Sequence, residues 1–203
     1  MSETTLVVGP AGLWDAEALG DVAAATFPLA CPPGTAPDDI EAFLAAMLSA
    51  ERFGEYLGDP DRIVLRAAED GEIVGYAMLH VGTPEDPAIA EAVGLSPAVE
   101  LSKLYVLPGR HGSGVAAALM RSALEHAAAA GGAGIWLGVN QHNTRAQRFY
   151  TRSGFERCGT KTFRVGAELH DDFIMRLRFR SPGPPGPAPR PGSRRAPGGS
   201  PGR

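Results

Sequence analysis

The sequence predicts one α/β domain in which strands and helices alternate along residues 1–180. Segments 62–68 and 72–81 alternate apolar and polar residues, and the turn signal Glu-Asp-Gly at 69–71 joins them, so they predict a β-hairpin. Residues 104–120 read LYVLPGRHGSGVAAALM, which is typical of a buried strand, a glycine loop and an alanine-rich helix. The chain has 203 residues, 44% of them hydrophobic, which is enough for one substantial core and short for two.

Local patterns predict the remaining elements: acidic residues and Pro at helix starts, Gly and Pro at breaks. In order we expect a strand at 6–8, a helix at 14–27 ended by Pro28, a loop at 29–35, a helix at 37–50, the hairpin, a loop at 82–97 with a helical turn at 88–93, a strand at 99–107, a helix at 113–130 ended by Gly131 and Gly132, a strand at 134–139, a helix at 144–152, and strands at 155–165 and 170–179.

The glycine loop before the helix at 113–130 is a candidate anion site. Backbone N–H groups at a helix start have no helical partner, and Gly112 and Gly114 let a phosphate approach them. The alternative is that these glycines only allow a tight turn. There is no GxxxxGK[ST] and no GxGxxG followed by an acidic residue, which argues against a nucleotide hydrolase and a dinucleotide oxidoreductase.

The same stretch resembles the acetyl-CoA signature of the GCN5-related N-acetyltransferase (GNAT) superfamily, a strand ending in V-x-P followed by [QR]-x-x-G-x-[GA]. The first position departs from the family, because His111 stands there and Arg110 lies one residue early. A second block, residues 134–155 (GIWLGVNQHNTRAQRFYTRSGF), resembles the family's next strand, its N-x-x-A-x-x-F-Y helix and the following G-F. The pyrophosphate-binding positions that the first signature implies are His111, Gly112, Ser113, Gly114, Val115 and Ala116.

This resemblance implies a GNAT-type mixed, mostly antiparallel sheet flanked by helices, with acetyl-CoA in a splay after the central strand. In the family, that strand's backbone binds the pantetheine arm and donates to the thioester carbonyl, which here points to Leu104, Tyr105 and Val106. The reaction implied is acetyl transfer from acetyl-CoA to an amine. The patterns VELSKLYVLP and FRVGAELHDDFIM resemble PaiA-type polyamine acetyltransferases and favour a small amine such as a polyamine.

Tyr150 and Asn143 are the site candidates of the helix at 144–152. A phenol with an ordinary pKa near ~10 is protonated at neutral pH, so Tyr150 can protonate the departing thiolate. The resemblance assigns Asn143 to the pantetheine arm. The alternatives are that Tyr150 and Phe149 are core aromatics and that Asn143 is a helix N-cap.

Glu100 is the first candidate for the general base, acting through water, by its place on the central strand and the family's frequent use of a carboxylate there. Alternation places it on the same face as Val106. Its alternative role is a strand-end partner of Lys103, and His80 is the second candidate base. Acids of the first helices could instead meet an amine or simply be solvated: Asp38, Asp39, Glu41, Glu51 and Glu55.

Charge and composition limit the classes of partner, the cellular location and the cofactors that we expect. Four arginines give residues 181–203 a charge of +4, so a net charge of −4 leaves −8 for residues 1–180, which suits a cationic small molecule better than nucleic acid. No apolar run could span a membrane and no signal peptide is evident, so we expect a cytoplasmic protein. No metal is expected, because Cys31 and Cys158 lack ligand spacing.

Three questions stay open at this stage. The Pro-, Gly- and Arg-rich segment 181–203 is expected to be a disordered tail outside the domain. The oligomeric state is open between a monomer and a homodimer. The acceptor is also open, because a protein or peptide amine, or a non-catalytic acetyl-CoA sensor, would fit the same signatures.

Overall fold

The computed structural model describes residues 5–31, 34–110, 112–165 and 168–179. Its seven strands form one sheet in the order β1-β2-β3-β4-β5-β7-β6, in which only the β4–β5 pair is parallel. The strands are β1 (Leu6–Pro10), β2 (Arg62–Glu69), β3 (Glu72–Val81), β4 (Ala98–Val106), β5 (Gly134–Asn140), β6 (Glu156–Val165) and β7 (Glu168–Arg178). The helices are the short η1 (Leu13–Asp15), α1 (Ala16–Ala30), α2 (Pro37–Met47), α3 (Ala50–Gly58), α4 (Pro87–Val93), α5 (Val115–Ala129) and α6 (Thr144–Arg152). The predicted mixed, mostly antiparallel sheet is confirmed.

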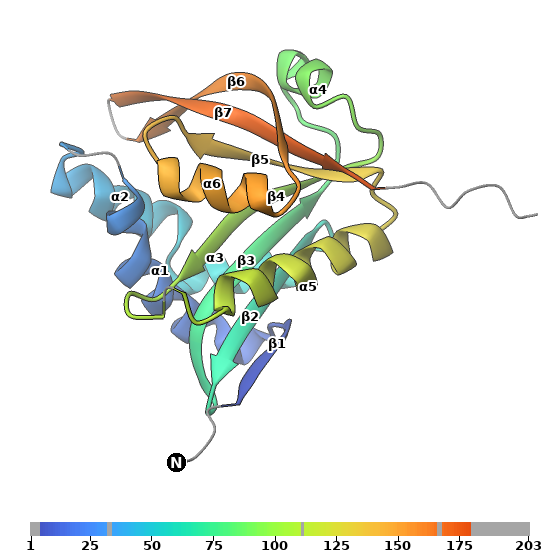
Figure 1. Cartoon of the computed structure of the whole chain (residues 1–203). Helices are drawn as coiled ribbons and strands as arrows, with labels where there is room; N and C mark the ends of the chain where they lie inside the picture. The colour runs from blue at the N-terminus through green and yellow to red at the C-terminus, as the bar shows by residue number, and fades with distance from the viewer. Residues whose placement is uncertain (1–4, 32–33, 111, 166–167, 180–203) are drawn as a thin grey trace, which may run out of the picture.

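Helices cover both faces of the sheet (Figure 1). On one face, α5 buries Leu119 and Ala123 against β2, β3 and β4, and α6 adds Phe149 to the same core. On the other face, α1 and α3 bury Leu19 and Phe53 against Tyr76. The apolar residues of successive helical turns therefore fix each helix to one face, and the central strands are buried on both.

The sheet opens between its two central strands. The pairing of β4 with β5 stops after three residue pairs, the last being Glu100 with Trp136. Beyond that point β4 continues to Val106 along β3, whereas β5 continues to Asn140 along β7. The backbone of residues 101–106 therefore has a strand neighbour on one side only, and the expected splay after the central strand is present.

A β-bulge at Ser102 changes which way β4 points its side chains. Leu79 pairs with Leu101 but Met78 pairs with Lys103, so Ser102 is the extra residue, and its Oγ donates to the carbonyl of Met78 at 3.1 Å. Both Leu101 and Leu104 pack in the core under α5, although they are three residues apart. The bulge therefore reverses the alternation within β4.

The expectation that Glu100 and Val106 share a face is therefore wrong. Val106 packs in the core under α5, as do Val99 and Leu101 on either side of Glu100. Glu100 lies on the opposite face. Lys103 and Tyr105 share that face with it, because the bulge lies between.

Two helix predictions also need correction. Helix α1 continues past Pro28 to Ala30, since proline removes only its own N–H and the next bond, Cys31 N–H to the carbonyl of Phe27 (3.2 Å), still forms. The helix expected at 37–50 is α2 and ends at Met47. The sequence prediction missed α3 altogether, whose start Ser49 caps by accepting from the N–H of Arg52 at 3.3 Å. The other expected elements occur within a few residues of their predicted bounds, and the segment 181–203 lies outside the described residues.

Candidate functional site

A cleft of about 920 Å³ follows the opening between β4 and β5. One half is lined by the start of α5 and by α6, including Gly114, Ala117 and Asn143. The other half is lined by α1 to α3 and by strand residues, including Phe43 and Tyr56. The exposed edge of β4 runs between the two halves, so a ligand lying along that edge would touch both.

The start of α5 is built to receive an anion. Gly112 and Gly114 have φ of 87° and 90°, in the left-handed region that glycine adopts without strain. The first bond across the helix start runs from the N–H of Ala118 to the carbonyl of Gly114 (2.9 Å). The N–H groups of Val115, Ala116 and Ala117 come before it at the positive end of the helix dipole, where a phosphate could accept from them.

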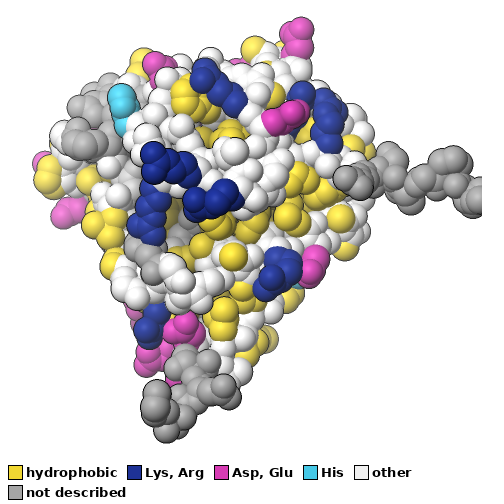
Figure 2. Space-filling model, in the orientation of Figure 1, with side chains coloured by type: hydrophobic (Ala, Val, Ile, Leu, Met, Phe, Trp, Pro, Cys, Tyr) yellow, Lys and Arg dark blue, Asp and Glu magenta, His cyan; other side chains and the backbone are white. Residues whose placement is uncertain are grey.

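The loop before this helix start is held by local contacts. Ser113 Oγ donates to the carbonyl of Arg110 at 2.6 Å, and Arg110 Nε lies 2.8 Å from Glu69 Oε2 at the end of β2. Arg110 also lines the cleft, with Arg145 and Arg152 of α6. Figure 2 shows Lys and Arg side chains gathered on the face where α6 and this loop lie. His111 lies outside the described residues.

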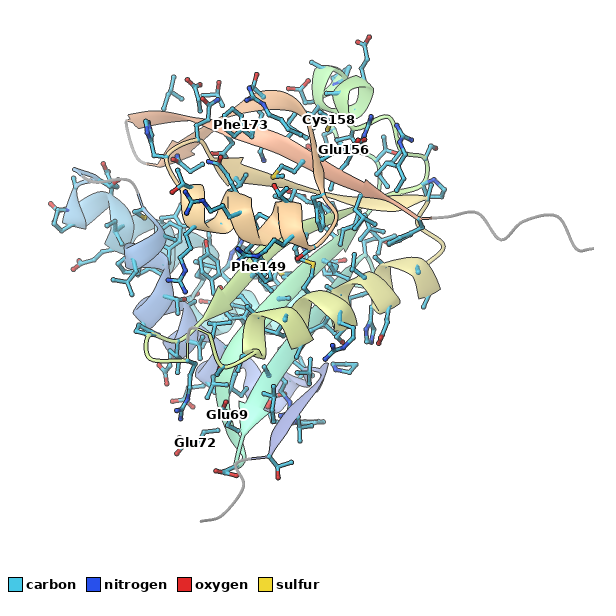
Figure 3. All side chains as sticks on the ribbon, in the orientation of Figure 1. Glu69, Glu72, Phe149, Glu156, Cys158 and Phe173 are labelled. Atoms are coloured by element: carbon cyan, nitrogen blue, oxygen red, sulfur yellow. The ribbon has the colours of Figure 1, made fainter. Side chains whose placement is uncertain are left out.

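Helix α6 brings two predicted residues to the cleft. Asn143 caps the helix, as its Oδ1 accepts from the N–H of Ala146 at 3.0 Å, so the amide NH₂ stays available to a ligand. Tyr150 packs edge-on against Phe149 and Phe155, with ring centroids 5.5 and 5.9 Å away. Figure 3 shows Phe149 on the side of α6 that faces the sheet. The cap interpretation of Asn143 is confirmed.

Tyr105 and Tyr150 are held in the protonated form. Burial raises the pKa of Tyr150 to about 12. Burial also raises the pKa of Tyr105 well above its ordinary value, with smaller contributions from Tyr150, Cys31 and Asp172. Among the described residues no hydrogen-bond partner is present for the hydroxyl of Tyr150, so that proton is available to a ligand.

Charged residues of both signs lie on the cleft face of the sheet. Glu100 and Lys103 of β4 both line the cleft, and within the described residues neither makes an ion pair within 4.0 Å, so the alternative pairing of these two is not formed. Burial lowers the pKa of Lys103 to about 8, Glu100 opposes this, and Arg62 and Lys161 add to it. Charges of both signs therefore act on Lys103.

The fold brings together the predicted residues that the structure describes. Gly112, Gly114, Ala116, Asn143, Tyr150, Glu100, Leu104, Tyr105 and Val106 all line the cleft, whereas Ser113 and Val115 belong to the same loop and helix start without lining it. His80 is the ladder partner of Glu100 but is not among the described lining residues, and neither are the acids of the first helices.

Sequence reasoning missed several lining residues: Arg62, Lys161, Asp172, Asn140 and Tyr56. They come from four strands and α3, and no local motif joins them. One signal was available. The chain contains only two lysines among its 19 basic residues, Lys103 and Lys161, and both line the cleft.

Neither a metal site nor a membrane-spanning helix is present among the described residues. They contain no group of three or more His, Cys, Asp or Glu side chains placed to hold a metal ion. No helix in the same ranges combines the length and the hydropathy needed to cross a bilayer.

Comparison with known proteins identifies the family. The family model described as the acetyltransferase (GNAT) family matches residues 25–155. An uncharacterized N-acetyltransferase of Mycobacterium tuberculosis is 55% identical over 161 residues, covering 79% of this chain and 96% of the relative. The chain belongs to the GNAT family. It is an acyl-CoA-dependent N-acetyltransferase with acetyl-CoA as its co-substrate.

Solved structures show the same fold at low sequence identity. The PaiA N-acetyltransferase of Thermoplasma acidophilum, in complex with coenzyme A, is 19% identical with a TM-score of 0.67 and covers 86% of this chain and 99% of that one. Arabidopsis thaliana NAA60, in complex with a bisubstrate analogue, is also 19% identical, with a TM-score of 0.65 over 86% of this chain and 98% of that one. At this identity the likeness concerns the fold.

Proposed function

We propose that this acetyltransferase moves the acetyl group directly from acetyl-CoA to the primary amine of a small acceptor. The observation that carries the proposal is the free backbone edge of β4 at residues 101–106, which runs along a cleft that also contains Tyr150 and Glu100. Both reactants can then lie side by side in one site, which lowers the entropic part of the barrier.

The donor would lie along β4 and the start of α5. The pyrophosphate would accept from the N–H groups at Gly112–Ala116, and the pantetheine arm would bond to the backbone of Leu104–Val106 and to the amide of Asn143. A backbone N–H of the same strand would polarise the thioester carbonyl. The contribution of the His111 side chain stays a prediction from the sequence.

The chemical step needs one acid and one base. The amine nitrogen attacks the thioester carbon, the C–S bond breaks, and Tyr150 gives its proton to the departing thiolate, since its raised pKa keeps it protonated at neutral pH. Glu100 takes the proton that the amine loses, through a water molecule. Both groups touch the reacting atoms or their bridging water, so both are catalytic residues in this proposal.

The test measures thiol release from acetyl-CoA with a panel of primary amines, and CoA binding by calorimetry. Tyr150→Phe should lower kcat by about a hundredfold or more with little change in CoA affinity, because the phenyl ring keeps its packing. Glu100→Gln should flatten the acidic limb of the pH–rate profile. The control is Glu72→Gln at the exposed start of β3, at the far end of the hairpin in Figure 3.

Two results would overturn parts of the proposal. Unchanged kcat in Tyr150→Phe would remove Tyr150 from the mechanism. Tight CoA binding with no turnover of any amine would favour a sensor.

The charged residues of the cleft bear on the class of amine that the enzyme accepts. The likeness to PaiA-type sequences favours a polyamine, and that remains a prediction. The acids of α2 and α3 that would favour a polycation are not among the lining residues. We call the half of the cleft that is lined by α1 to α3 and by strand residues the acceptor half; its charged residues are Arg62, Lys103, Lys161, Glu100 and Asp172, of which Arg62 is paired with Asp59 at 3.1 Å. We therefore derive the acceptor class from these side chains.

A further inference from the structure

We propose that the acceptor is a small amine that also carries a carboxylate, and that Lys103 and Lys161 bind this carboxylate in the acceptor half of the cleft. The inference rests on the proposed acetyl transfer and adds the chemical class of its substrate. It also assigns a binding role to two residues that the acetyl-transfer mechanism does not use.

The placement of the two lysines is the first observation. Lys103 lies on β4 and Lys161 on β6, the edge strand, yet both side chains reach the same cleft. The other 17 of the 19 Lys and Arg residues are arginines, and among the described ones Arg52, Arg62, Arg66, Arg110 and Arg176 form ion pairs. The acceptor half of the cleft is thus where the compact ammonium groups of this chain converge.

Lys103 is a half-buried cation that forms no ion pair within the described residues. Its side chain is mostly covered, and within the described residues it makes no hydrogen bond and no ion pair. Burial lowers its pKa, Glu100 opposes this in part, and Arg62 and Lys161 lower the pKa further. A desolvated ammonium is costly unless an opposite charge compensates it, and a bound carboxylate would supply that charge.

Lys161 is held against the floor of the same cleft. Its Nζ lies 5.4 Å from the centre of the Trp136 ring, and a Cβ at Gly138 would come within 3.0 Å of Nζ and overlap Cε. Glycine at 138 therefore leaves the space through which Lys161 reaches the cleft. Asp172, its ladder partner, approaches the same point, where a Gly138 Cβ would lie 3.2 Å from Oδ2.

The arrangement of signs fits a zwitterion better than a polycation. Glu100 can attract the amine toward the thioester, while Lys103 and Lys161 on the same face can hold a carboxylate. A polyamine would instead place a second and third positive charge beside Lys103 and Lys161, and like charges disfavour such binding. The cleft, at about 920 Å³, must also hold the reactive end of acetyl-CoA, so the remaining space suits a small acceptor.

The test uses acceptor pairs that differ only in the carboxylate. The initial rate of thiol release is compared for β-alanine against propylamine and for γ-aminobutyrate against butylamine, with spermidine and a short peptide as further acceptors. The kcat/KM of each amino acid should exceed that of its matched amine by at least about tenfold. Spermidine or the peptide as the best acceptor, or equal rates within the pairs, would overturn the inference.

Substituting the two lysines tests whether they cause the preference for acceptors that carry a carboxylate. Lys103→Met should raise KM for β-alanine by about tenfold with a smaller change in kcat, and Lys161→Met should act in the same direction. The control is Arg121→Met on the exposed face of α5, which removes the same charge outside the cleft. A preference that persists in both lysine variants would overturn the inference.

Calorimetry separates this inference from the proposed function. β-Alanine should bind to the CoA-loaded protein, and Lys103→Met should weaken this binding by about tenfold while the affinity for CoA itself is unchanged. Turnover of amines with no preference for a carboxylate defeats the inference alone. Absence of both CoA binding and turnover defeats the proposed function, and the inference with it.

Discussion

The lowered pKa of Lys103 predicts how the stability of the protein depends on pH, whatever the substrate is. Burial lowers the pKa of Lys103 from 10.5 to about 8, so between these values the unfolded chain binds more protons than the folded protein. The free energy of unfolding of the wild type should therefore rise with pH across this range, and below pH 8 the folded protein carries the full cost of a buried ammonium.

Lys103→Met removes that cost while keeping the length of the side chain. The free energy of unfolding at pH 7 should increase by about 1–3 kcal/mol, and the increase should fade as the pH rises from 8 toward 10.5. Urea unfolding at several pH values measures it, with Arg121→Met as the control that shows no such pH dependence. A loss of stability in Lys103→Met at pH 7 would mean that the ammonium has a compensating partner in the protein.

The proposed anion-binding role of the start of α5 can be tested by substituting two glycines that have similar positive φ angles. Gly114 at the start and Gly131 just beyond the end have φ of 90° and 81°, and a Cβ at either would meet nothing within 4 Å. Replacing either by alanine should lower the free energy of unfolding by about 1–2 kcal/mol, because a Cβ is strained in the left-handed region.

Only Gly114→Ala should also weaken CoA binding, by about tenfold, since the backbone donors lie at that end of the helix. Calorimetry with CoA on both variants makes the comparison. Equal CoA affinity in the two would show that the phosphates bind elsewhere.

The contact between β3 and β4 depends on a glycine of another kind. A Cβ at Gly75 would lie 2.8 Å from the carbonyl oxygen of Tyr105 and 3.1 Å from Cγ2 of Val106, where β4 forms the edge of the cleft. Gly75→Ala should lower the free energy of unfolding by about 1–3 kcal/mol and raise KM for acetyl-CoA, because β4 must shift. Gly54→Ala in α3 is the control, as its Cβ would meet nothing within 4 Å and a helix interior favours alanine. Thermal unfolding and initial rates together test the pair.

The net charge of the whole chain and the charge of the side chains that line the cleft have opposite signs. The chain carries a net charge of −4, yet six basic side chains and two carboxylates line the cleft: Arg62, Lys103, Arg110, Arg145, Arg152 and Lys161, with Glu100 and Asp172. An anionic co-substrate is therefore attracted to one face of an acidic protein (Figure 2). Net charge alone suggested a cationic partner and stays silent on the co-substrate, whereas the distribution of charge accounts for an anionic one.

This distribution predicts a salt effect. Raising the ionic strength from about 20 to about 300 mM should increase KM for acetyl-CoA several-fold and leave kcat nearly constant, since screening weakens attraction over distances of about 10 Å. Initial rates at fixed acceptor concentration measure it. A KM that stays constant would mean that the arginines around the cleft add nothing to binding of the co-substrate.

The sequence by itself determined the elements whose signals are local. Glycines in the loop before α5, apolar periodicity in the hairpin and in α5, and the Asn143 cap of α6 each act over a few residues, so their positions could be read from the chain. The order of these elements, with the two motifs in them, also indicated the family and its co-substrate. The errors, at Pro28 and at Ser49, arose where packing or a cap outweighed the local pattern.

Only the tertiary structure decided what the acceptor half of the cleft contains. The bulge at Ser102 has no signature of its own, because it arises from how β4 fits against β3, and it brings Lys103 to the face of Glu100. Lys161 joins them because β6 pairs with β7 and glycine at 138 leaves room for it. Alternation and spacing describe a strand along its own length, whereas a binding site is made by strands that meet across a sheet.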